Sequence, residues 1–192
     1  MKLHPWIPGA ALAATLLAAC GASPPLRYYA LDVVAPAANA PNSPATTLIR
    51  VRHISLPPEM DHRGLTHHQG ATQLAISESD QWSAPLGQLI QGALTRDLGE
   101  RLGYEHVVAP AAQPVAAGQA SLDLDFVALA ADDSCGISAQ VNWMLSVPNG
   151  TPHSGTARLS APASSCPAGL PAALSAALGD LADQLARQLP PS

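Results

Sequence analysis

The sequence predicts an α+β fold, with a mixed or largely antiparallel sheet and two main helices packed on it. Three observations support this prediction. Apolar residues recur at steps of three and four over residues 82–102 and 170–185, which is the spacing of one helix face. Several shorter segments alternate apolar and polar residues, as strands with one buried face do. Pro148-Asn149-Gly150 separates two of these segments and predicts a hairpin turn.

The composition fits one globular domain. Of the 192 residues, 47% are hydrophobic and 12% are charged, which argues against global disorder. Lys2 is the only lysine and lies in a segment that we expect to be removed, so eight arginines and fourteen acidic residues give the remaining chain a net charge of −6. Nucleic-acid-binding proteins need a basic surface, and no arginine cluster is denser than Arg50 and Arg52. We therefore expect no nucleic-acid partner.

Residues 1–19 are expected to form a signal peptide. Their apolar run, residues 7–19, is too short to span a bilayer. It ends in Leu17-Ala18-Ala19-Cys20, a pattern that resembles the bacterial lipobox and makes Cys20 the expected site of lipid attachment. The alternative is an ordinary secretory peptide followed by an incidental cysteine.

Residues 20–27 would then be a short lipidated tether. Seven residues after Cys20 span at most about 25 Å when extended, so the domain is expected to stay close to its membrane. Gly21, not Asp, follows the cysteine. By resemblance to the sorting rule of bacterial lipoproteins, this favours the outer membrane, with the protein on its periplasmic face.

The folded part is expected to be a single domain over residues 28–189. In its first half, a Pro/Ala/Asn-rich linker covers residues 35–46. Ile49, Val51 and His53 should share one face of a strand. Gln69-Gly70 marks a hairpin turn. The expected strands are residues 28–34, 47–54, 63–68 and 72–77.

A helix is expected next. Its apolar stripe runs from Trp82 to Leu102, with Ser83 as N-cap, Pro85 in the first turn and Gly103 at its end. Its opposite face offers a polar surface for a subunit contact, made of Gln88, Gln91, Thr95 and Arg96.

The second half should contain more strands and a closing helix. A loop is expected at residues 109–118, and the last helix carries a leucine stripe from Leu170 to Leu185. The expected strands are residues 104–108, 120–130, 136–147 and 155–161.

Two cysteines lie at the open end of the last hairpin. A turn centred on Asn149-Gly150 places Cys135 and Cys166 nearly opposite each other, and an exported protein can form a disulfide. We expect this disulfide. The alternatives are two free thiols or a redox pair, although the chain has no Cys-x-x-Cys motif.

No pattern of catalytic, metal-binding or cofactor-binding residues stands out. His67 and His68 are adjacent in an expected strand, so their side chains should point to opposite faces and cannot easily hold one ion. Gly-x-Ser-x-Gly and phosphate-binding glycine loops are absent. Asp123 and Asp125 fit the solvated face of a strand. We expect no catalytic residue, no metal and no cofactor.

Several segments together resemble one family, the ABC-type transport auxiliary lipoproteins, which include PqiC of the paraquat-inducible Pqi system and are also described as membrane integrity-associated transporter subunits. The segments are Tyr28-Tyr29-Ala30-Leu31, Leu56-Pro57-Pro58, Arg63-Gly64-Leu65-Thr66 and, most specifically, Gln81-Trp82-Ser83-Ala84-Pro85-Leu86. We expect Tyr28, Tyr29, Leu31, Trp82, Pro85 and Leu86 to be structural motif residues.

The resemblance implies a non-catalytic role and a fold like that of the amino-terminal domain of TolB. Members are outer-membrane partners of periplasmic mammalian-cell-entry (MCE) domain proteins, whose tunnels carry lipid, and of their inner-membrane component. The lipoprotein would dock the tunnel and form a homo-oligomeric ring. The alternatives are an unrelated periplasmic lipoprotein that binds a small ligand or assists outer-membrane assembly, and a hydrolase.

Overall fold

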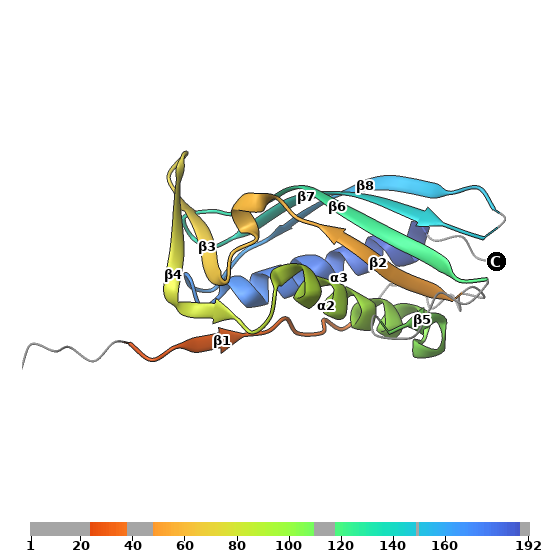
Figure 1. Ribbon diagram of the computed structural model, residues 1–192, viewed down its shortest axis with the longest axis horizontal. Helices are drawn as coiled ribbons and strands as arrows, with labels where there is room; N and C mark the ends of the chain where they lie inside the picture. The colour runs from red at the N-terminus through yellow and green to blue at the C-terminus, as the bar shows by residue number, and fades with distance from the viewer. Residues whose placement is uncertain (1–23, 38–47, 110–117, 149, 189–192) are drawn as a thin grey trace, which may run out of the picture.

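The structure is a computed structural model that describes residues 24–37, 48–109, 118–148 and 150–188. The expected signal peptide, Cys20 and most of both expected loops lie outside the described residues. The fold is α+β, as predicted, but its strands form two sheets instead of one (Figure 1).

The larger sheet has five strands in the order β5-β2-β6-β7-β8. β2 runs parallel to both β5 and β6, whereas β6, β7 and β8 are antiparallel neighbours. Two helices, α2 and α3, lie side by side on one face of this sheet (Figure 1). The bounds are β2 Ile49–Ser55, β5 Val107–Val108, β6 Ala120–Ala131, β7 Ile137–Ser146, β8 His153–Ala161, α2 Leu86–Leu102 and α3 Leu170–Gln188.

The smaller sheet stands at one end of the molecule (Figure 1) and has the order β1-β4-β3. β3 (Gly64–Gln69) and β4 (Gln73–Trp82) form the predicted hairpin, and Gly70 in its turn has a φ of 74°. β1 (Arg27–Tyr29) pairs with β4 in parallel. A short 3-10 helix, η2 (Pro58–Met60), separates β2 from β3. A second one, η3 (Tyr104–His106), fills most of the expected strand 104–108.

The core lies between the five-stranded sheet and the two helices. The leucine stripes of both helices are buried, as the periodicity predicts. On the sheet side, every second residue of β7 is buried against them, and β6 follows the same alternation except at an irregularity between Phe126 and Ala128. Gly155 of β8 lies beneath the Trp143 ring: an added Cβ would lie 2.7 Å from that ring.

The β7–β8 hairpin has nearly the predicted register. Leu145 pairs with His153 and Ile137 pairs with Ala161. Beyond the open end of this hairpin, Cys135 and Cys166 form the predicted disulfide, with their Cα atoms 5.2 Å apart.

The face assignment in β2 is wrong for His53. The β2–β6 register passes from Val51 paired with Leu122 to His53 paired with Asp123, so Arg52 is an extra, bulged residue. A bulge reverses the alternation beyond it. His53 therefore turns outward to an exposed position.

The start of α2 also differs from the prediction. Trp82 ends β4 and does not begin the helix, and Ser83 makes no cap. Pro85 precedes the first helical residue, Leu86, as the N-cap with no side-chain hydrogen bond. Trp82 is still buried, because a strand side chain at the junction reaches the same core. Gly103 ends the helix with a φ of 92°.

The polar face predicted for this helix is only partly free. Thr95 is buried, and its hydroxyl donates to the Gln91 carbonyl. The Gln91 amide donates to the carbonyl oxygens of Val51 and Arg52, next to the β2 bulge. Gln88 and Arg96 remain exposed.

Candidate functional site

The expected motif residues converge where β1 meets β4. Tyr29 of β1 pairs with Trp82, and the Ser83 amide donates to the Tyr29 carbonyl at 2.8 Å. The Trp82 amide donates to the Arg63 carbonyl of the chain that leads into β3, also at 2.8 Å. Trp82 thus joins three segments that lie far apart in the sequence.

Asp80 is the polar centre of this junction, and sequence reasoning missed it. Its carboxylate is buried and accepts hydrogen bonds from Arg27 Nη2 at 2.9 Å, the Tyr29 hydroxyl at 2.9 Å and the Ser77 hydroxyl at 3.0 Å. Arg27 Nε lies 2.7 Å from the other carboxylate oxygen. Burial raises the pKa of Asp80, but the hydrogen bonds from Arg27, Tyr29 and Ser77 outweigh it and leave the pKa below its ordinary value.

The other motif residues divide into buried and exposed ones. Leu31 and Leu86 belong to the core. Tyr28 is 55% exposed, and Pro85 is exposed at the helix start. Trp82 and Leu86 therefore have the packing expected of structural residues, while Tyr28 and Pro85 lie at the surface.

After β1, the chain runs along the two helices and is held there by side chains. The Asp32 amide donates to the Ser175 hydroxyl of α3 at 3.0 Å, and the Val34 amide donates to Asp97 Oδ1 of α2 at 2.8 Å. Arg96 donates to the Leu31 carbonyl at 3.1 Å. The segment that follows the expected tether is thus bound to both helices.

Arg101 is the centre of this attachment, and it is a buried residue with only 2% of its surface exposed. Its guanidinium donates to Asp183 Oδ1 at 2.6 Å, to the Asp97 carbonyl at 2.8 Å, to the Gly179 carbonyl at 3.1 Å and to the Val34 carbonyl at 3.2 Å. Arg101 therefore links α2, α3 and the N-terminal segment. Buried charges need such partners.

Asp97 is fully buried in the same cluster. Burial raises the pKa of its carboxyl, and the opposing influences of the Val34 amide, Arg101 and Arg96 do not cancel this rise. A sequence signal for the cluster did exist. Asp97 and Arg101 stand four residues apart inside an otherwise apolar helix face, where charged residues need a partner.

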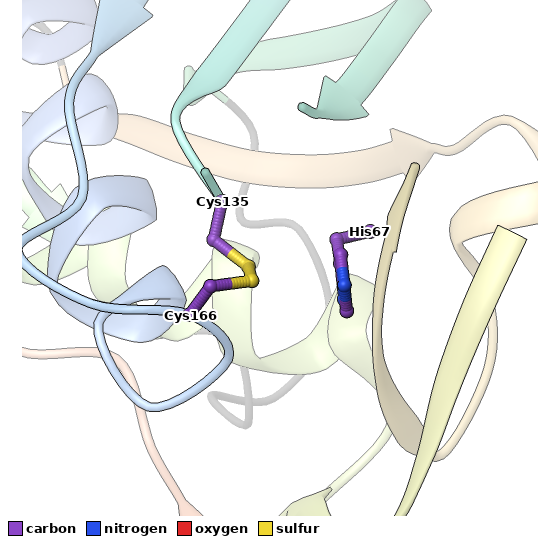
Figure 2. Close-up of side chains that lie close together, drawn as sticks. All are labelled: His67, Cys135 and Cys166. Atoms are coloured by element: carbon purple, nitrogen blue, oxygen red, sulfur yellow. A yellow bond between two sulfur atoms is a disulfide. The ribbon is translucent and has the colours of Figure 1, made fainter. Parts of the chain in front are cut away.

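The disulfide lies where the two sheets approach each other. Asp132 shapes the loop before β7: its Oδ1 accepts the Ser134 amide at 2.8 Å, the Ser134 hydroxyl at 2.6 Å and the Gly136 amide at 2.9 Å. These bonds lower the pKa of Asp132, the Ser134 hydroxyl most strongly. Cys135 lies inside this turn with a φ of 65°. Figure 2 shows its disulfide beside His67 of β3.

The surface carries open grooves of moderate size. One of about 320 Å³ lies between β2 and the start of α2 and includes Arg52, Pro85 and Gln88. Another, of about 530 Å³, crosses the outer face of the larger sheet and includes Asp123, Asp125 and Asn142. Asp123 is ion-paired with Arg52. The two aspartates of β6 are thus surface groups, and one of them already has a cationic partner.

No described helix is long and apolar enough to cross a membrane. Two solved structures share the fold. One, an uncharacterised protein, has a TM-score of 0.69 at 18% identity, covering 87% of this chain and 100% of its own. The other, a Xanthomonas campestris protein titled as DUF330, has a TM-score of 0.64 at 18% identity, covering 83% and 92%.

The family follows from a separate match. The model of the ABC-type transport auxiliary lipoprotein component matches residues 29–186. The chain therefore belongs to this family, as its motifs indicated, and is an auxiliary lipoprotein component of ABC-type transport. Among curated proteins, none matches the chain.

Proposed function

We propose that the protein is the outer-membrane-anchored, periplasmic subunit of an MCE-type, Pqi-like lipid transport system. Lipid on Cys20 would hold it to the membrane. The domain would dock the distal end of the periplasmic tunnel protein, whose inner-membrane component supplies energy or gating. In this role the protein performs no catalysis and requires no cofactor.

One structural observation supports this role most directly. Arg27, the first residue of β1, follows Cys20 by seven positions, at most about 25 Å of chain. β1 is hydrogen-bonded into the smaller sheet, and the segment behind it is bound to both helices. A lipid on Cys20 would therefore hold the domain itself at the membrane surface, as a docking subunit requires.

The membrane assignment is tested with two variants of the leader region. The full-length lipoprotein should fractionate with the outer membrane. Cys20→Ser removes the acceptor thiol and should abolish recovery of the protein with the outer membrane. Gly21→Asp keeps the thiol but changes the sorting residue, and should move the protein to the inner membrane. Outer-membrane recovery of Cys20→Ser would contradict lipid anchoring at this residue.

The partner is tested by mild cross-linking in cells, followed by affinity recovery of the full-length lipoprotein and mass spectrometry. We expect an MCE-domain protein in stoichiometric amount. Recovery of the lipoprotein alone, or with outer-membrane assembly factors, would contradict the proposed role. Cys20→Ser serves as the control, because it should lose the partner when it no longer reaches the outer membrane.

We also propose that the protein forms a homo-oligomeric ring and that its fold resembles the amino-terminal domain of TolB. The mass of the detergent-extracted lipoprotein tests the first point, and a monomer at all concentrations would contradict it. Superposition on that domain tests the second.

A further inference from the structure

Three potential metal ligands meet beside the disulfide. A ring nitrogen of His67 and the sulfur atoms of Cys135 and Cys166 all lie within 4.8 Å of one another. They come from β3, from the loop before β7 and from the loop before α3 (Figure 2). Among the described residues, no other group of histidine, cysteine and acidic side chains converges in this way.

His67 has a buried nitrogen that needs a partner. Its Nδ1 is inaccessible to solvent and forms no hydrogen bond with any described residue. A buried polar atom without a partner is unfavourable and calls for an explanation. The two sulfur atoms near the His67 ring are bonded to each other in the oxidised protein, so neither is available there as a thiolate ligand.

We propose that His67, Cys135 and Cys166 form a zinc site when the disulfide is reduced. A dithiol reductant supplies two electrons and two protons, and is itself oxidised to a disulfide, while the Cys135–Cys166 bond becomes two thiols. Zn²⁺ then displaces both thiol protons and binds the two thiolates. The unprotonated ring nitrogen of a neutral His67 side chain supplies the third ligand, and the other ring nitrogen keeps its proton.

The charge and the geometry suit Zn²⁺. Two thiolates and a neutral imidazole balance its charge, so the complex can occupy a place where Cys135 is fully buried. Zinc lies about 2.3 Å from sulfur, so two tetrahedral sulfur ligands are about 3.8 Å apart. The Cα separation of 5.2 Å lets side-chain rotation reach this spacing. Cys166 is partly exposed, which leaves a fourth position for water.

The site would change what joins the two sheets. In the oxidised protein, the Gly70 amide of the β3–β4 turn donates to Asp133 of the loop before β7, at 2.7 Å. Zinc would add a coordinate link between β3 and that same loop. This inference is independent of the lipid anchor and of the partner proposed above.

The test uses the full-length mature lipoprotein in detergent, in which lipidated Cys20 has no free thiol. The protein is reduced with a phosphine without oxygen, and Co²⁺ is added as a spectroscopic probe before Zn²⁺. We expect one Co²⁺ per chain, with the thiolate charge-transfer and d–d bands of a tetrahedral site, and displacement by one Zn²⁺. Oxidised protein should show neither band.

His68 supplies the matched control, because it neighbours His67 on the same strand and is not part of the cluster. His67→Gln should weaken Zn²⁺ binding at least tenfold and alter the d–d bands, whereas His68→Gln should change neither. Zinc should also raise the unfolding temperature of reduced wild-type protein and of His68→Gln, and should raise that of His67→Gln by clearly less at the same zinc concentration.

Three outcomes would overturn the proposal. One is equal affinity of wild-type protein and His67→Gln, as expected if an unfolded cysteine pair alone captured the ion. Another is equal binding by the oxidised protein. The third is failure of the reduced wild-type protein to bind either metal, whether or not it remains folded.

Discussion

Trp82 is the side chain on which the β1–β4 junction most depends. It is 2% exposed and pairs with Tyr29 across the smaller sheet. Trp82→Ala should lower the free energy of unfolding by about 3–5 kcal/mol, through lost burial and the cavity left behind. Urea denaturation measures this change. Met144→Ala, at a position 45% exposed, is the control and should cost far less. A loss below about 1 kcal/mol for Trp82→Ala would contradict a core role.

Asp80 should make stability depend on pH. The pKa of the Asp80 carboxyl is lower in the folded protein than in the unfolded protein. The ionised carboxylate therefore stabilises the fold fully at pH values above the unfolded pKa, and this stabilisation is lost as the pH falls through the folded pKa. Asp80→Asn should cost about 1–3 kcal/mol at pH 7, because hydrogen bonds to a charged group weaken. The difference between the two proteins should shrink below about pH 5.

This prediction is tested by urea denaturation of both proteins between pH 7 and pH 3. Asp97 has a raised pKa and acts in the opposite direction, but it is present in both proteins and cancels in the difference. A difference that stays constant over this range would show that the Asp80 charge does not stabilise the junction.

Single buried leucines could be predicted from sequence, whereas Asp80 could not. A leucine stripe is local and follows the helix period. The partners of Asp80 include Arg27 and Tyr29, which lie 53 and 51 residues away, and no spacing rule connects them. Burial of a lone aspartate in a serine-rich strand becomes understandable only once β1 is placed beside it.

At the scale of elements, Arg101 holds α2, α3 and the N-terminal segment together. Arg101→Leu should lower the free energy of unfolding by about 3–5 kcal/mol, because it leaves Asp97 and Asp183 buried without their cation. Hydrogen exchange at the Val34 amide should accelerate as well. Urea denaturation and exchange rates provide the two measurements.

Arg96 is the matched control for Arg101. It also donates to the N-terminal segment, at the Leu31 carbonyl, but its side chain is exposed. Arg96→Leu should therefore cost less than about 1 kcal/mol. Equal losses in the two variants would contradict a special role for the buried cluster. Replacing Asp97, Arg101 and Asp183 together by neutral residues should recover part of the loss.

The helices and most strands could be predicted, because their patterns are local. The errors fall where tertiary contacts interrupt a pattern. The bulge at Arg52 reverses which residues of β2 face the core. The side-chain amide of Gln91 in α2 donates to the Val51 and Arg52 carbonyl oxygens at this bulge. Trp82 continued the apolar stripe of the helix in sequence, yet it belongs to β4 because β1 and the Arg63 carbonyl pair with that strand.

For the whole molecule, the disulfide should be a major source of stability. It closes a separation of 31 residues, worth about 3.5 kcal/mol in the chain-entropy treatment. Cys135→Ser with Cys166→Ser should lower the free energy of unfolding by about that amount in metal-free buffer. Wild-type protein reduced without metal is the control and should lose a similar amount. An unchanged urea midpoint in the variant would contradict this expectation.

Architecture was predictable only in part at this scale. The predicted register of the last hairpin placed the two cysteines correctly, because the position of the turn determines which residues of the two strands lie opposite each other. The parallel pairing of β1 with β4 was not predictable, because it joins residues more than fifty positions apart that no local pattern connects. His67 stood out in the sequence only together with His68, and its proximity to Cys135 and Cys166 was not predictable, since both cysteines are distant from it in sequence. The family was recognisable from short motifs and the lipobox.

The way in which β1 joins the fold has a mechanical consequence. A force applied along β1 from its N-terminal end would load the three parallel pairs from Arg27 to Tyr29 in shear, together and not one after another. Behind them, Val34 is held by Arg101 and packs so closely on Gly179 that an added Cβ there would lie 2.7 Å from it. Such a force would therefore be transmitted directly to the two helices of the core.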